Sequence, residues 1–158
     1  MKNELNNTIK ARGVYEIRHY RNGKLLSEET IDNTSTTAGF AKIAGLYNED
    51  SSGGFKWLAL DESSTTYTAA STALGAEATS GGLGRASATC SRITTTNTSD
   101  TAQAVKTFTA TATKTVLGAG IFDTSTASAG TLSAGTHFTA KNMESDDTLQ
   151  VTYKVKIS

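Results

Sequence analysis

Residues 148–158 read TLQVTYKVKIS and carry the strongest structural signal in the chain. Apolar and polar side chains alternate along this segment, and a two-residue period places one set on each face of a β-strand. We therefore expect a strand with one face in a hydrophobic core and the other toward solvent. The apolar members are Leu149, Val151, Tyr153, Val155 and Ile157, and the polar members are Gln150, Thr152, Lys154 and Lys156.

A second alternating segment, VYEIRHY at 14–20, lies near the N-terminus. Asn22 and Gly23 follow it, and these residues supply the two positive φ angles of a type I′ turn. The segment KLLSEETID then returns antiparallel, so the sequence predicts a β-hairpin over residues 13–32. The face expected in the core carries Tyr15, Ile17 and His19.

A short helix is expected over residues 36–47, because apolar side chains recur there at helical spacing. Ser35, Thr36 or Thr37 can cap its N-terminus. We expect the apolar stripe to face a sheet, so that the helix plugs one end or face of it. The stripe contains Phe40, Ile43, Ala44 and Tyr47.

The remaining segments read as further strands and one long polar loop. In the loop, Leu74 is expected to anchor to the core while Glu77 stays in solvent. With seven to nine strands and one short helix, the chain is predicted to be mainly β, an antiparallel β-sandwich of jelly-roll-like type. The further strands are expected at 55–61, 85–96, 102–113, 113–123 (interrupted by Gly118 and Gly120) and 131–140.

Composition agrees with a β-sandwich and narrows the function classes. The chain has 158 residues, enough for one domain, and we expect a flexible N-terminal arm over 1–12 and a single domain over 13–158. The net charge is zero, which gives no electrostatic footprint for nucleic acid or an anionic membrane. Cys90 is the only cysteine, so no intrachain disulfide forms, and we expect synthesis in a reducing cytoplasm.

Candidate catalytic residues are few. His19 and His137 lie on predicted strands beside apolar residues, where a histidine is more often packed than catalytic. Cys90 lies in a predicted strand, and we expect it to be buried and inert. The zinc-binding spacings HxH, HExxH and CxxC do not occur. The sequence therefore predicts no catalytic, cofactor-binding or metal-binding residues, and a protein that is not an enzyme.

Two acidic clusters leave an alternative open. Asp61-Glu62 follows a predicted strand, and a second cluster precedes the last strand. Loop carboxylates can bind Ca²⁺, but they also accept the hydrogen bonds of turns. The glycine-rich GGLGR at 81–85 lacks the lysine and helix of a phosphate-binding loop. The second acidic cluster is Glu144, Asp146 and Asp147.

Several short segments, taken in order, resemble small accessory structural proteins of tailed bacteriophages. They are NGKLLSEETIDN, TTAGFAKIAGL, FKWLALDESSTTYTAASTALGAE, AGIFD, THFTA and DTLQVTYKVKIS, and they span most of residues 13–158. Members of this group are virion components: capsid decoration proteins, head fibres, or parts of tails and fibres. This chain departs from the group at Asp61-Glu62-Ser63, where relatives often have a Gly-Thr-Gly turn.

The resemblance implies a non-enzymatic virion protein and does not separate these positions on the particle. We expect a capsid decoration or head-appendage protein, because the chain is compact and has no long shaft or coiled coil. The resemblance also implies a homo-oligomer, a trimer or larger, with phage capsid or tail proteins as partners. Low-charge segments could form the subunit contacts in a semi-polar interface, or they could be ordinary solvated faces of a sheet. The small residues of the first of them would let a neighbouring backbone approach. These segments are Gly118–Phe122, Thr107–Thr113 and Thr124–Ser133.

Three alternatives stay open at this point. One is a tail or fibre component of the virion. The second is a carbohydrate-binding, adhesin-like module, which would need Trp57, Tyr67 and Tyr47 to be exposed, although we expect Trp57 to be buried. The third is a virion-borne hydrolase, whose remaining candidate residues are Glu62, His137 and Asp146. We also expect the N-terminal arm to become ordered only against a neighbouring subunit.

Overall fold

The computed structural model describes residues 10–47 and 53–158. One sheet, called sheet A, comprises β1 (Ala11–Arg21), β2 (Lys24–Asp32), β6 (Thr89–Ile93), β7 (Thr101–Thr109) and β10 (Thr148–Ile157). The other, sheet B, comprises β3 (Thr34–Ser35), β4 (Trp57–Asp61), β5 (Ala86–Ser87), β8 (Lys114–Phe122) and β9 (Leu132–Met143). The helix α1 spans Thr37–Tyr47.

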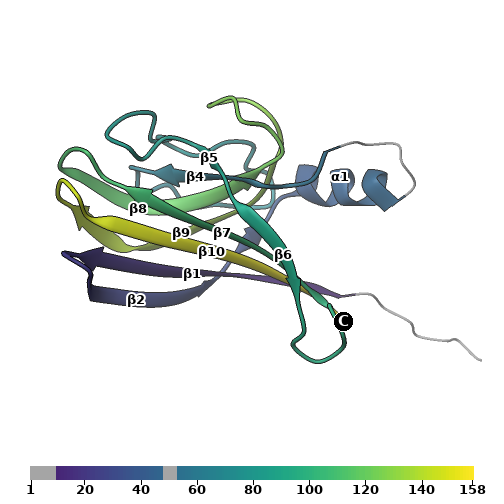
Figure 1. Cartoon of the computed structure of the whole chain (residues 1–158). Coiled ribbons are helices and arrows are strands. Elements are labelled where there is room, and N and C mark those ends of the chain that lie inside the picture. The colour runs from purple at the N-terminus through teal and green to yellow at the C-terminus, as the bar shows by residue number, and fades with distance from the viewer. Residues whose placement is uncertain (1–9, 48–52) are drawn as a thin grey trace, which may run out of the picture.

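The two sheets form the layers of an antiparallel β-sandwich, and α1 lies at one end of it (Figure 1). The strand order is β2-β1-β10-β7-β6 in sheet A and β3-β9-β8-β4-β5 in sheet B. In Figure 1, α1 and the C-terminus are at the right-hand end, and the tip of the β1–β2 hairpin is at the left-hand end. The predicted antiparallel β-sandwich with one short helix is confirmed.

The predicted N-terminal hairpin is confirmed. β1 pairs with β2, and the turn residues Asn22 and Gly23 have φ angles of 50° and 72°. On its other side β1 pairs with β10 in an unbroken register from Ala11 to Tyr20. The two alternating segments of the sequence therefore lie side by side in sheet A, and their apolar faces join in one layer of the core.

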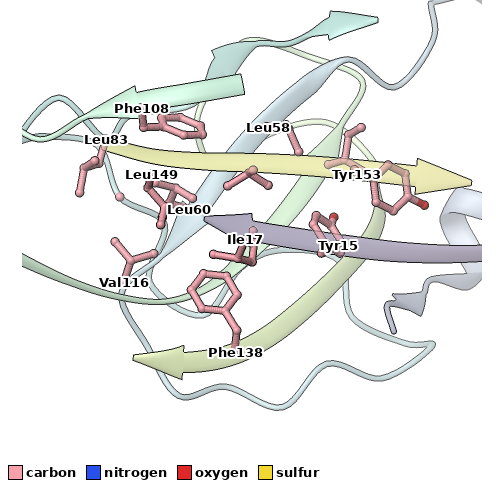
Figure 2. Packing of buried hydrophobic residues seen from close by; sticks show 14 of the residues in the cluster. Tyr15, Ile17, Leu58, Leu60, Leu83, Phe108, Val116, Phe138, Leu149 and Tyr153 are labelled. Atoms are coloured by element: carbon pink, nitrogen blue, oxygen red, sulfur yellow. The ribbon is translucent and has the colours of Figure 1, made fainter. Parts of the chain in front are cut away.

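The core lies between the sheets. Tyr15 and Ile17 of β1 are completely buried, and Figure 2 shows them pointing into the same cluster as Leu58 of β4 and Tyr153 of β10. The Tyr15 hydroxyl donates a hydrogen bond of 2.9 Å to the carbonyl oxygen of Ala134 in sheet B. This bond gives the buried phenol a partner and links the two layers.

The strand predicted over 85–96 is wrong as a single element. It divides into β5, which pairs with β4 in sheet B, and β6, which pairs with β7 in sheet A. Ala88 lies between them, and its amide donates to the carbonyl oxygen of Lys56. The chain therefore changes sheets at this residue, and a run of small polar residues gives no sequence signal for such a crossing.

The outer face of sheet B is covered by the long loop between β4 and β5. Tyr67 and Leu74 of this loop are buried and pack with Phe122 and Leu132 of sheet B. A Cβ atom on Gly120 of β8 would lie 2.8 Å from side-chain atoms of Leu74, so the loop can approach only because this residue is glycine. The predicted anchoring role of Leu74 is confirmed.

This packing corrects the role suggested for Gly118–Phe122 as a contact with another subunit. Every residue of that segment is buried within the subunit. Its ladder with β9 shifts register between Val116 and Gly118, which marks a bulge or irregularity where the strand was expected to be interrupted. The close backbone approach that the glycines permit is used by the chain's own loop. The other two suggested segments remain largely exposed.

The helix α1 begins where expected, but its apolar stripe does not face a sheet as predicted. The Thr36 hydroxyl accepts a 2.9 Å hydrogen bond from the Gly39 amide, which caps the helix. Gly39 and Gly45 are the buried residues of the helix, and a Cβ on Gly39 would lie 2.6 Å from the Ser133 carbonyl oxygen. The helix therefore docks through glycines. Its apolar stripe points outward: Phe40, Ile43, Ala44 and Tyr47 are all exposed.

The predicted flexible arm over 1–12 is wrong at its C-terminal end. Ala11 and Arg12 belong to β1, and Lys10 exchanges backbone hydrogen bonds with Ser158. Residues 1–9, and with them the expectation that the arm orders against a neighbour, lie outside the described residues.

Candidate functional site

The carboxylate of Asp61 is fully buried and organises the long loop. It accepts hydrogen bonds from the amides of Ser63, Gly75 and Ala76, from the Ser63 hydroxyl and from the Tyr67 hydroxyl. Burial alone would raise the pKa of Asp61, but these donors hold it below its ordinary value. A carboxylate whose lone pairs are taken by N–H and O–H donors has none left for Ca²⁺.

The glycine-rich GGLGR segment ends in a buried ion pair rather than a phosphate site. The Arg85 guanidinium lies 2.7 Å from the Glu77 carboxylate, and both side chains are almost fully buried. Arg85 also stacks on the Phe122 ring at 3.7 Å and donates to the carbonyl oxygens of Thr124 and Ala129. The prediction that Glu77 stays in solvent is therefore wrong, because Glu77 and Arg85 fix the loop after β8.

The second acidic cluster consists of one buried and two exposed carboxylates. Asp147 is buried, and its carboxylate contacts the Arg21 guanidinium at 2.8 Å and His19 Nε2 at 2.9 Å. The Arg21 guanidinium is the main cause that lowers the pKa of Asp147 well below its ordinary value. Glu144 pairs with Arg21 at 2.7 Å, and Asp146 is exposed in the turn. This cluster closes the end of the sandwich opposite α1 (Figure 1).

Ser27 adds a hydroxyl to this cluster and brings together the residue types of a serine hydrolase. Ser27 is paired with His19 across β1 and β2, and its Oγ is buried with no hydrogen-bond partner among the described residues. The nucleophile–base hydrogen bond is therefore missing, and Oγ has no access to solvent. The arrangement of Ser27, His19 and Asp147 fits a structural role.

The remaining candidates are dispersed. His19 is packed as predicted, whereas His137 is exposed on β9, so the packed interpretation of His137 is wrong. Cys90 was expected to be buried and is exposed on β6. Within the described residues, no group of three or more His, Cys, Asp or Glu side chains could hold a metal ion. No described hydrogen bond or ion pair joins Glu62, His137 and Asp146 to one another.

The aromatic residues considered for sugar binding do not lie together on a solvent-exposed face. Trp57, which was expected to be buried, is half-buried and packs on the cluster beneath the long loop. Tyr67 is buried, and burial together with its hydrogen bond to Asp61 raises its pKa. Tyr47 alone of the three is exposed, at the end of α1.

The open site of the molecule is at the end where α1 lies. There the inner face of sheet A lines a groove, together with Ile121 and Ser133 of sheet B. Val155 of β10 pairs with Ala102 of β7, and Ala102 pairs with Arg92 of β6, so their side chains share this face. Alanines occupy positions where larger side chains would fill the space. The next row inward contains Tyr153, Ala104 and Cys90.

The opposite wall of the groove is formed by Ile43 of α1 and by Phe55, which precedes β4. Lys42 holds the helix in place through an ion pair of 2.7 Å with Asp123 and lies 5.9 Å from the centre of the Phe55 ring. The volume of the groove is about 530 Å³, and its lining is mostly apolar. We call it the end groove, defined by Ile43, Phe55, Ala102, Ala104, Val155 and Ile157.

No protein-family model, curated protein or solved structure matches this chain. The function must therefore be argued from the residues themselves. The helix of the described chain is not long and apolar enough to cross a membrane.

The end groove continues into an exposed apolar surface. We call Phe40, Ile43 and Tyr47 the helix stripe; they are 51%, 43% and 93% exposed. Phe40 and Ile43 line a smaller cavity that adjoins the end groove along Tyr153 and Val155. An apolar hollow beside projecting aromatic side chains is suited to binding another molecule, and it contains no arrangement of groups for chemistry.

Sequence reasoning missed the end groove. Val155 and Ile157 were assigned to the core as the apolar face of an alternating strand, and Ile43 was assigned to a stripe that faces a sheet. The one available signal was size: Ala102 and Ala104 are too small to fill the space opposite Val155 and Tyr153. That signal indicates a hollow only once the pairing of β7 with β10 is known.

Proposed function

We propose that this chain is a non-enzymatic structural protein of a bacteriophage virion, most simply a capsid decoration or head-appendage protein present in many copies. It would be made in the host bacterial cytoplasm and would function on the particle. The order of segments that resembles accessory phage proteins first suggests this role. The observation that carries it is the exposed apolar end of a sandwich with zero net charge.

The polar residues support a role in contacts rather than chemistry. Asp61, Glu77 and Asp147 are each used to hold loops or turns by hydrogen bonds and ion pairs within the chain. A protein of this kind would withstand local opening, because its long loops are tied to buried carboxylates. Such resistance suits a component of a particle surface.

A tail or fibre component is the alternative position on the particle, and the surface of the chain fits it equally well. The carbohydrate-binding alternative is less favoured, because Tyr67 is buried and Trp57 is half-buried, so neither offers a free ring face to a sugar.

The test is quantitative mass spectrometry of density-purified phage particles from cells that carry this gene. Peptides of the chain should stay with the particles, in an amount of the same order as the major capsid protein. Host cytosolic proteins of similar abundance in the lysate serve as the carry-over control. A few copies per particle would favour the tail or fibre alternative, and absence from the particles would contradict the proposal.

A further inference from the structure

We propose that the end groove binds a second copy of this chain, and that the helix stripe of one copy enters the end groove of another. The inference deepens the proposed function and rests on it in one respect: assembly in many copies is what brings a second chain to this surface. It assigns the subunit contact to one end of the sandwich, where Ser133 is the residue of the suggested Thr/Ser/Ala segments that lines the groove.

The shape of this end is the first argument. A projecting element and a hollow lie next to each other, since Ile43 belongs both to the helix stripe and to the wall of the end groove. A surface that carries both can pair with a copy of itself, either around a two-fold axis or head to tail in a ring. Tyr47 is 93% exposed at the end of the helix and is the natural anchor, because exposed tyrosines that fill a pocket often dominate binding.

The area is the second argument. The exposed parts of Phe40, Ile43, Tyr47 and Ile157 present on the order of 400 Å² together, if a fully exposed aromatic side chain presents about 200 Å². A standard interface buries about 800 Å² per partner. The walls of the end groove supply further apolar area beside these side chains, so this end of the molecule approaches what one stable interface requires.

Charge gives the third argument. The net charge of the chain is zero, so two copies do not repel one another at long range. Lys42, the charged residue of α1, is already paired with Asp123 of its own chain. Arg92 is the charged residue that lines the end groove, so an interface here would have this one group to leave at its polar rim.

Other occupants fit less of this surface. A small apolar ligand could fill the 530 Å³ groove but would leave Phe40 and Tyr47 in water. Only a partner with both a projecting apolar element and a hollow covers the whole end, and the chain itself has that form.

The test measures the mass of the full chain in solution by sedimentation equilibrium over a wide concentration range. We expect the mass to rise above the 16.5 kDa of one chain as the concentration increases. The double substitution Phe40→Ser with Tyr47→Ser should keep it at one chain. The matched control is Leu25→Ser with Leu26→Ser, which removes two exposed apolar side chains of β2 at the hairpin end and should associate like the wild type.

A substitution in the end groove tests the role of the groove independently of the helix stripe. Ala102→Lys places a charged chain in the end groove beside Arg92 and should also give a protein that stays monomeric. Mixing the groove variant with the Phe40/Tyr47 variant leaves one intact stripe and one intact groove per pair. Heterodimers should therefore form in the mixture, although neither variant associates alone.

Cys90 provides a second measurement. It is the only cysteine of the chain, it is exposed, and it lines the end groove. Its reaction with a thiol reagent should slow severalfold as wild-type protein is concentrated, and it should not slow in the Phe40/Tyr47 variant. Slower reaction with no rise in mass would mean a small ligand in the groove and would overturn the proposal.

The same variants separate this inference from the proposed function. A wild-type chain that stays at 16.5 kDa at all concentrations, or a Phe40/Tyr47 variant that associates normally, would overturn the interface. If such a protein is still incorporated into particles, the proposed function survives without it. If the chain associates through the end groove but is absent from purified particles, the interface stands and the proposed function fails.

Discussion

Two apolar surfaces of this molecule lie outside the core between the sheets, and they are treated differently. On the outer face of sheet B, Phe122 and Leu132 are covered by Tyr67 and Leu74 of the chain's own loop. At the end of the sandwich near α1, the helix stripe and the end groove remain open. The first surface completes the fold, whereas the second is available to another molecule.

The two surfaces differ in the contacts that hold the neighbouring segment of the chain in place. The covering loop is held by Asp61 and by the Glu77–Arg85 pair, all of them buried. The helix α1 is instead docked through Gly39 and the Lys42–Asp123 pair, which leaves its large side chains outside. Within residues 10–47 and 53–158, the chain covers the apolar outer face of sheet B and leaves the helix stripe exposed.

The largest loss of stability should come from removing the Asp61 carboxylate, which holds the covering loop. Asp61→Ala should lower the free energy of unfolding by about 3–5 kcal/mol, because several amides and the Tyr67 hydroxyl lose their partner in a buried site. Urea denaturation measures it. The control is Asp32→Ala, which breaks an exposed ion pair with Arg12 and should change stability by at most about 1 kcal/mol. Equal losses in the two variants would refute the role of Asp61.

The second largest loss of stability should come from breaking the ion-pair cluster at the hairpin end of the sandwich. This loss should depend on pH. Asp147→Asn should lower the free energy of unfolding by about 2–3 kcal/mol at neutral pH, because the charged hydrogen bonds to Arg21 and His19 are lost. The folded-state pKa of Asp147 is lowered, so its contribution is complete above the unfolded value of about 4 and is lost as the pH falls further. The wild type and the variant should therefore converge in stability in acid.

Denaturation curves of both proteins between neutral and acidic pH test whether the stability difference shrinks as the pH falls. A difference that stays constant, or that grows as the pH falls, would show that the Asp147 charge is not the stabilising group.

A steric change beneath the covering loop should have a smaller effect. Gly120→Ala places a Cβ about 2.8 Å from side-chain atoms of Leu74 and Leu132, and such overpacking should lower the free energy of unfolding by about 1–3 kcal/mol. Gly54→Ala is the matched control, since a Cβ there meets no atom within 4 Å. Thermal unfolding would distinguish them, and a tolerated Gly120→Ala would mean that the loop is loosely packed.

The open end should contribute least to folding. Tyr47→Ser should change the free energy of unfolding of the dilute protein by no more than about 0.5 kcal/mol, because the side chain is 93% exposed. Denaturant titration at low protein concentration checks this value. A loss above about 2 kcal/mol would show that Tyr47 already packs within one subunit, and the contrast between the two surfaces would disappear.

Sequence patterns predicted the sandwich because apolar and polar residues alternate along its long strands. β1 and β10 are two such segments, and Asn22-Gly23 specifies the hairpin turn, whereas the pairing of β1 with β10 was not predicted. The patterns failed for α1, where the apolar stripe was assigned to the core although glycines make the contact. A glycine contact depends on how closely two backbones approach, and helical periodicity carries no information on that distance.

The candidate site was harder to predict for the same reason. Glu77 and Cys90 were assigned to the wrong environments because the burial of a polar residue depends on a distant partner. Glu77 is buried by its contact with Arg85, whereas Cys90 is exposed on β6 and lines the end groove. By contrast, Leu74 was predicted correctly, since a lone large apolar residue in a polar loop has few alternatives to burial.

The central claim is that one apolar surface is closed within the subunit and the other closes between subunits. The most direct measurement is amide hydrogen exchange of the full chain at low and at high protein concentration. The account predicts that protection rises with concentration in α1 and β6, which border the end groove, and stays unchanged in the loop that carries Tyr67 and Leu74. Exchange in α1 and β6 that does not depend on concentration would contradict it.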